Sequence, residues 1–218
     1  MRTATVARVW FGLTALVVGL GIVVQLFATA DVENGRFAAL HSRLFNVFCF
    51  FTVQSNVIVG VTCLLLALSL DRPSTAYRVL RLDGLIGIVV TFVVFHVALS
   101  SLQELSGKAA VADFLLHTAS PIMCALGWVM FGPRGWVTWR VVWLSLIFPI
   151  CWLAFTLIRG PIVSFYPYPF LDVDEHGYPR VLLSSLVVAF LFVGLGALAR
   201  VADRWLTRAG SSNAVTPH

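Results

Sequence analysis

Charged residues are scarce in this chain of 218 residues, at 11% of the total, and long hydrophilic stretches are absent. A soluble globular domain carries roughly 25% charged residues, so the composition argues against that class. Hydrophobic residues reach 59%, and the mean hydropathy is +0.92. Together these values indicate an integral membrane protein.

The four cysteines form no C-x-x-C motif, and none lies in a predicted outer loop. This excludes a secreted disulfide framework and gives no zinc-ligand spacing. We therefore expect small packing residues at Cys49, Cys63, Cys124 and Cys151. The acidic segment 172–176 lacks the glycine and terminal glutamate of an EF-hand loop, so neither a metal ion nor a cofactor is expected.

Strict alternation of apolar and polar residues is also absent, which argues against a membrane β-barrel. Apolar runs of roughly 20 residues recur instead, and a run of that length spans a bilayer as a helix. Six such runs are present: Val6–Phe27, Leu44–Leu70, Val79–Ser100, Val111–Phe131, Val137–Ile158 and Val181–Val201. The sequence therefore predicts an all-α polytopic protein, with one six-helix transmembrane domain over residues 1–218.

The first run lies between MRTATVAR and FATA and so resembles a secretory signal peptide. It is longer than the roughly 7–15 residues of a signal-peptide core. We therefore expect a retained membrane helix.

Basic residues fall mainly on one side of the predicted bundle. Six spans place both termini on the same side, and that side receives most of the arginines: Arg2, Arg8, Arg72, Arg78, Arg81, Arg134, Arg140, Arg200, Arg204 and Arg208. The positive-inside rule then predicts cytoplasmic termini in the cell membrane. No basic patch interleaved with aromatic residues suggests nucleic-acid binding.

A polar cluster interrupts the second run, in the stretch FFTVQSNV. Thr52, Ser55 and Asn56 share one helix face at i, i+3 and i+4, whereas Gln54 points away. Thr52 lies eight residues from the predicted helix start, about 12 Å at a rise of 1.5 Å per residue. Hydrogen bonding between helices is the simplest explanation of such residues.

A second polar cluster lies in the fourth run, at a similar predicted depth. Asp113, His117 and Ser120 share a helix face, and an intramembrane histidine suggests function by default. Pro121 has no N–H to offer the carbonyl of His117, so we expect a bend there. His96 lies near the outer end of the third run, as either a structural donor or a member of the same site.

The longest predicted connection runs from Arg159 to Arg180 and contains the motif YPYPFL. Its prolines and aromatic residues predict a stiff, apolar segment. It either folds back over the outer ends of the helices or lies passively in the headgroup region.

The chain resembles the family of androgen-induced gene 1 and androgen-dependent TFPI-regulating protein. The resemblance lies in three motifs that follow one another along six helices: FFTVQSN, LLHT followed by a proline, and YPYPFL. It is closest to the bacterial relatives of the family. The resemblance implies a membrane threonine hydrolase that cleaves fatty acid esters of hydroxy fatty acids. It places Thr52 on the nucleophile and His117 on the base, and it makes Tyr168 a supporting residue. The animal members differ, with an acidic residue near the position of Gln54 or Ser55 and paired histidines where Leu157–Arg159 stands here.

The chemistry needs more than these two residues. A threonine hydroxyl attacks an ester only when a base takes its proton, and that base needs an orienting partner, for which Asp113, His96 and Asn56 are candidates. Fixed donors must also stabilise the oxyanion, and Asn56, Ser55 or Arg159 could provide them. The substrate would be a lipid ester entering from the bilayer.

Two other functions remain open at this stage. One is a non-enzymatic lipid or small-molecule transporter or binding protein. The other is a haem-binding electron carrier, since His96 and His117 lie on adjacent spans at similar depth and two histidines can ligate one haem.

Overall fold

The computed structural model describes residues 2–32, 36–72, 74–101 and 104–212. Helices make up every regular element within these ranges: α1 Arg2–Ala30, α2 Leu40–Val47, α3 Phe51–Leu68, α4 Thr75–Val94, η1 Phe95–Leu99, α5 Gly107–Phe114, η2 Leu115–Ala119, α6 Ser120–Phe131, α7 Trp139–Leu144, α8 Ile147–Val163, η3 Pro169–Leu171 and α9 Val173–Ser212. Among the described residues, six helical segments are long and apolar enough to cross a membrane. One of them joins α7 and α8 across a turn, and α9 is interrupted by non-helical backbone at Gly177. The predicted all-α, six-span architecture is therefore confirmed.

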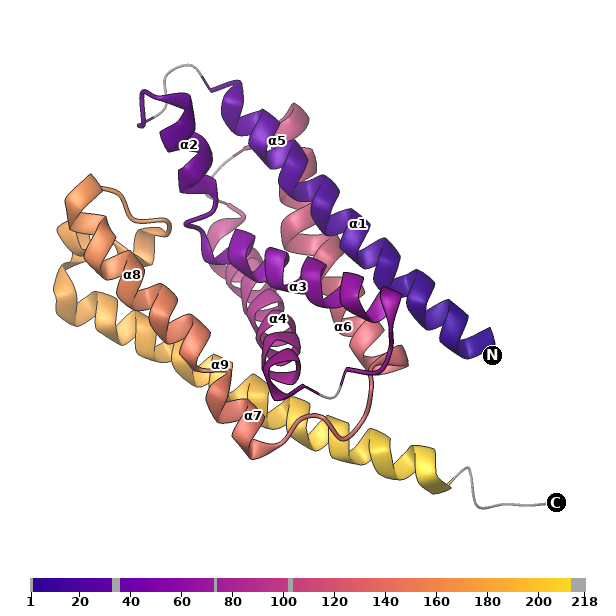
Figure 1. The fold of residues 1–218 in the computed structure, drawn as a ribbon. Helices are drawn as coiled ribbons and strands as arrows, with labels where there is room; N and C mark the ends of the chain where they lie inside the picture. Colours follow the sequence, from indigo (N-terminus) through magenta and orange to yellow (C-terminus); the bar gives the residue numbers. More distant parts are fainter. Residues whose placement is uncertain (1, 33–35, 73, 102–103, 213–218) are drawn as a thin grey trace.

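The bundle is built around α3 and α4, which pack against each other near its centre (Figure 1). α1 packs on α3 and on the α5–η2–α6 rod, while α9 packs on α4 and α7. Phe11, Leu66, Ile88 and Phe192 are fully buried in the core. Many large apolar side chains of α1 and α9 are exposed instead, such as Leu16 and Phe190, as expected for helices that face lipid.

The predicted second span, Leu44–Leu70, is wrong as a single helix. α2 ends at Val47. In the next three residues each N–H donates a hydrogen bond to the carbonyl three residues earlier, and Phe50 is extended, with ψ of 135°, before α3 begins. Thr52 consequently lies in the first turn of α3 and not deep within a continuous helix. α3 starts at the end of the bundle opposite the two termini (Figure 1).

Side chains compensate the backbone groups that this break leaves unpaired. The carbonyl of Cys49 accepts a 2.9 Å hydrogen bond from Trp152 Nε1 of α8. The carbonyl of Phe48 accepts one of 2.9 Å from Gln54 Nε2, which explains why Gln54 points away from its polar neighbours. The break is thus a stable feature held from two sides.

Two π-helical turns, η1 and η2, interrupt the third and fourth spans at His96 and His117. In each turn a serine N–H donates to the carbonyl five residues earlier, from Ser100 to Phe95 and from Ser120 to Leu115. The bend expected at Pro121 therefore takes the form of a π turn, which ends just before the proline. Such turns are frequent at functional sites.

The segment 164–172, which joins α8 to α9, folds inward over the end of the bundle. Tyr166 and Leu171 are buried, at 8% and 2% exposure. Tyr166 packs so closely on Gly160 that a Cβ there would overlap its ring. The inward fold brings the YPYPFL motif against the start of α3.

Candidate functional site

Thr52 is held by Tyr168 across 116 residues of sequence. The Tyr168 hydroxyl lies 3.1 Å from Thr52 Oγ1 and accepts a hydrogen bond of 3.1 Å from the Thr52 N–H. Burial raises the pKa of Tyr168, and the hydrogen bonds from Thr52 oppose this only in part, so the hydroxyl is neutral and can donate.

The first turn of α3 supplies unpaired backbone donors at this point. The first intrahelical bond runs from Gln54 N–H to Phe50 carbonyl, so the N–H groups of residues 51 to 53 have no partner within the helix. The positive end of the α3 dipole lies at the same place. This combination stabilises negative charge beside the hydroxyl of Thr52.

Asn56 and Ser120 connect the first turn of α3 to η2 and α6 by hydrogen bonds. The amide of Asn56 donates to the carbonyls of Thr52, at 2.9 Å, and Leu116, at 3.1 Å. Ser120 Oγ donates to Asn56 Oδ1 at 2.6 Å. Both residues are fully buried, and together they tie the first turn of α3 to η2 and α6. Asn56 has no donor left for an oxyanion.

His117 is oriented by Asp113, one turn before it. Its Nδ1 lies 2.9 Å from Asp113 Oδ1 and 3.3 Å from the Asp113 carbonyl. The ring of Phe95 stacks on the imidazole at 4.1 Å between centroids. Nδ1 is therefore fixed as the donor, and Nε2 is left as the basic nitrogen, in the manner of an Asp–His pair.

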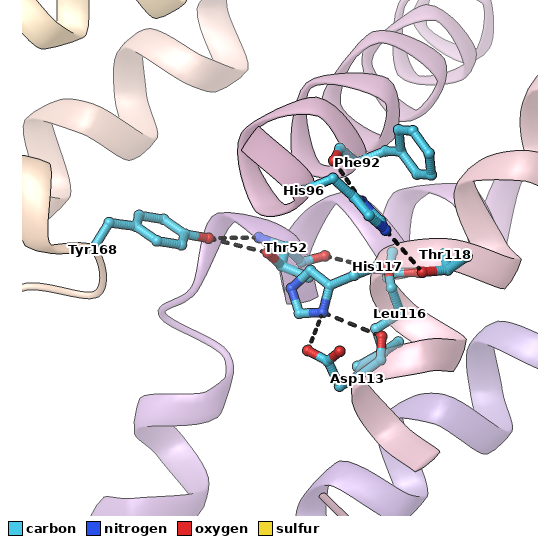
Figure 2. A network of polar contacts seen from close by, with 9 residues as sticks. Thr52, Phe92, His96, Asp113, Leu116, His117, Thr118 and Tyr168 are labelled. Atoms are coloured by element: carbon cyan, nitrogen blue, oxygen red, sulfur yellow. Dashed lines mark hydrogen bonds and ion pairs between the residues drawn. The ribbon is translucent and has the colours of Figure 1, made fainter. Parts of the chain in front are cut away.

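Thr52 lies between Tyr168 on one side and His117 with Asp113 on the other in Figure 2. Thr52 and His117 face the same two cavities. Within the described ranges no direct hydrogen bond joins them, since the Thr52 hydroxyl is paired with Tyr168. Catalytic hydrogen bonds often form only when substrate is bound.

An apolar cavity of about 180 Å³ lies on one side of these residues, between α3, α4, α8 and α9. We name it the apolar cavity; among its lining residues are Val90, Leu153, Phe170 and Val188. The other space has a volume of about 690 Å³, and its lining mixes apolar residues such as Phe37 and Leu105 with Gln25, Arg43 and Asp113. We name it the polar chamber because these polar side chains distinguish it from the apolar cavity. Thr52, His117, Tyr168, Phe95 and Leu99 line both.

Three of the expected site residues lie elsewhere. Ser55 faces Gly87 of α4 and does not reach the cavities. Arg159 donates 3.0 Å to Asn46 Oδ1 and stacks on Phe37 and Phe45, so it binds α8 to the α2 region. His96 is exposed, with Nδ1 at 2.9 Å from the Phe92 carbonyl and Nε2 at 3.4 Å from Thr118 Oγ1.

The placement of Phe95 bears on the haem alternative. Its ring lies 4.1 Å from His117 and 5.0 Å from His96 between centroids, so it fills the space next to both imidazoles. His96 does not line either of the two cavities. Of the two histidines, only His117 faces the cavities. In the described part of the chain, no three His, Cys, Asp or Glu side chains come close enough to hold a metal ion.

Sequence reasoning did not find the contact of Tyr168 with the backbone of α3, nor the contribution of Phe95. The YPYPFL motif marked Tyr168 as a supporting residue, but its partner could not be read from spacing alone. Phe95 had no signal, because an aromatic residue in an apolar span is ordinary.

Comparisons with protein-family models, with curated proteins and with solved structures gave no match.

Proposed function

We propose that this protein is an intramembrane lipid-ester hydrolase, with Thr52 as nucleophile and His117 as general base. The observation that carries the proposal is the position of these two residues, where an apolar cavity meets a polar chamber beside the start of α3. A site at such a junction suits a lipid ester whose acyl chain lies in the apolar cavity and whose alcohol half lies in the polar chamber.

The reaction would follow acyl transfer in two halves. Thr52 Oγ forms a bond to the ester carbonyl carbon while its proton passes to His117 Nε2. The carbonyl oxygen becomes the oxyanion and replaces Tyr168 as the acceptor of the α3 N–H groups, with the Tyr168 hydroxyl as a further donor. The C–O bond then breaks, and the alcohol leaves with the proton held by His117.

Water completes the cycle. It attacks the acyl-threonine while His117 accepts its proton, and the same donors stabilise the second oxyanion. The bond between the acyl carbon and Thr52 Oγ1 then breaks, the fatty acid leaves, and His117 returns the proton to Thr52 Oγ1. Asp113 keeps the proton of neutral His117 on Nδ1 throughout, and no step requires a metal ion.

Each of the two spaces would bind one half of the ester substrate. The apolar cavity would take the fatty acyl chain, since its lining is almost entirely aliphatic and aromatic. The polar chamber would take the alcohol half and the attacking water. A fatty acid ester of a hydroxy fatty acid, the substrate implied by the resemblance to the androgen-induced gene 1 family, fits this division.

Membership of that family and cytoplasmic termini in the cell membrane are part of the same proposal. The arginine distribution supports the orientation. With that orientation, the site would lie in the outer half of the bilayer. The hydrolase would then draw its substrate from the outer leaflet.

Hydrolysis of a branched fatty acid ester by the purified protein in uncharged detergent tests the proposal. We expect turnover by the wild type, loss of at least about 1,000-fold in Thr52→Ala and His117→Ala, and partial retention in Thr52→Ser. Thr62→Ala is the matched control, because Thr62 lies on the same helix and its hydroxyl donates to backbone carbonyls of that helix. If the wild type and all the variants bind the ester tightly but none of them hydrolyses it, the lipid-binding alternative is supported instead.

A further inference from the structure

A small pocket lies at the opposite end of the bundle, near the two termini. It is formed by the start of α4, the end of α6 and the segment that follows α6, and its lining is Arg78, Arg81, Leu82, Trp128, Pro133, Trp136 and Val137. Its volume of about 10 Å³ admits roughly one oxygen-sized atom. Two arginines in so small a space are unusual, because like charges repel.

Arg81 is buried at 4% exposure with its charge only partly compensated. Its Nη1 donates to the sulfurs of Cys63, at 3.2 Å, and Cys124, at 3.9 Å, and thiols are weak acceptors. Its Nε and Nη2 are buried without a hydrogen-bond partner. An unpaired guanidinium in the bundle interior is costly unless an anion or another acceptor reaches it.

Arg78 adds a second charge to the same pocket. Its guanidinium carbon lies 5.4 Å from the centre of the Trp136 ring, and its Nε is also buried without a partner. Neither arginine forms an ion pair with a carboxylate in the described residues. The nearby carboxylate of Asp203 accepts instead from the N–H groups of Gly135 and Val137.

We propose that this pocket binds one oxygen of a phosphate group between Arg78 and Arg81. Guanidinium groups match phosphate geometry with paired, charge-assisted hydrogen bonds, and three buried N–H-bearing nitrogens await an acceptor here. The volume admits one oxygen while the rest of the phosphate stays at the mouth. The phosphate comes from an anionic phospholipid of the adjacent leaflet or from free inorganic phosphate.

Thermal unfolding of the purified full-length protein in uncharged detergent tests this site. The probes are an ether-linked phosphatidic acid, the matching dialkylglycerol without phosphate, and inorganic phosphate; ether lipids exclude hydrolysis at Thr52. We expect phosphatidic acid to raise the Tm by about 5 °C at saturation, with no effect of the dialkylglycerol. A rise with inorganic phosphate alone would identify the free ion as the source.

The variants Arg81→Gln and Arg78→Gln should remove the phosphate-dependent rise in Tm. Arg140→Gln is the control, since Arg140 is an exposed arginine at the same end that does not line the pocket. If Arg81→Gln does not fold, Arg78→Gln decides, because Arg78 is only partly buried. No rise in the wild type, or an equal rise in Arg78→Gln and Arg140→Gln, would overturn the proposal and leave a pocket for water.

Discussion

At the scale of single residues, Tyr168 is the contact that joins the two halves of the site. Its hydroxyl meets both the N–H and the Oγ1 of Thr52 at 3.1 Å. In the proposed mechanism the hydroxyl thereby orients the nucleophile and donates to the oxyanion beside the N–H groups of α3.

Tyr168→Phe tests that contribution. Removing one oxyanion donor costs roughly 100-fold in kcat, and we expect a loss of this size with a small change in KM. The measurement is steady-state hydrolysis of the ester, with Tyr178→Phe as control because Tyr178 is 52% exposed. Equal rates for the two variants would contradict the assigned contribution of Tyr168.

Asp113→Asn tests the orientation of His117. An asparagine keeps the size of the side chain but no longer fixes the proton on Nδ1, and we expect kcat to fall by roughly 1,000-fold. Asp31→Asn is the control, since Asp31 forms an exposed ion pair with Lys108. A kcat within a few-fold of wild type in Asp113→Asn would contradict the assignment of Asp113 as the residue that orients His117.

For the polar residues of FFTVQSNV, the sequence predicts which side chains share a helix face but not which partners they contact. Spacing put Thr52, Ser55 and Asn56 on one face, and all three are buried. It could not tell that Asn56 reaches Leu116 and Ser120 while Ser55 faces Gly87. A face about 100° wide touches two neighbouring helices, and only their packing decides which residue meets which.

At the scale of elements, the break between α2 and α3 is the feature that creates the site. Hydropathy predicted one long helix because Phe48 to Phe51 are as apolar as their flanks. The groups that stabilise the break, Trp152 and Tyr168, lie about 100 residues further along the chain. No local pattern could reveal them.

Gly160→Ala tests whether the inward fold of segment 164–172 is required. The new Cβ would overlap the ring of Tyr166, so the segment must shift and carry Tyr168 away from Thr52. We expect a fall in kcat of roughly 100-fold and a loss of about 1–3 kcal/mol in stability. Both follow from parallel assays of hydrolysis and thermal unfolding.

Gly194→Ala is the matched control, because a Cβ at Gly194 meets no neighbour within 4 Å. This variant should keep full activity. If Gly160→Ala also keeps it, Tyr168 is not held in place by this segment.

At the scale of the whole molecule, the six helices enclose two spaces that meet at Thr52 and His117. The number and nature of the spans could be predicted, since bilayer thickness fixes the length of each apolar run. The cavities could not, because they depend on how helices far apart in the sequence pack: α3, α4, α8 and α9 around the apolar cavity, and α1, α2, α3 and α5 around the polar chamber.

Val188→Phe tests which half of the substrate enters the apolar cavity. The larger ring would fill part of the space, and we expect kcat/KM to fall for long acyl chains while short ones are retained. Val187→Phe is the control, since Val187 is 63% exposed on the outer face of the same helix. An unchanged chain-length profile in Val188→Phe would show that the acyl chain lies elsewhere.

The most direct measurement is labelling of the purified protein with a fluorophosphonate, followed by mass spectrometry of the modified peptide. The proposed mechanism predicts one adduct on Thr52 in the wild type and in Thr62→Ala, and none in Thr52→Ala. Absence of labelling in the wild type, or equal labelling of Thr52→Ala, would contradict the assignment of Thr52 as the nucleophile.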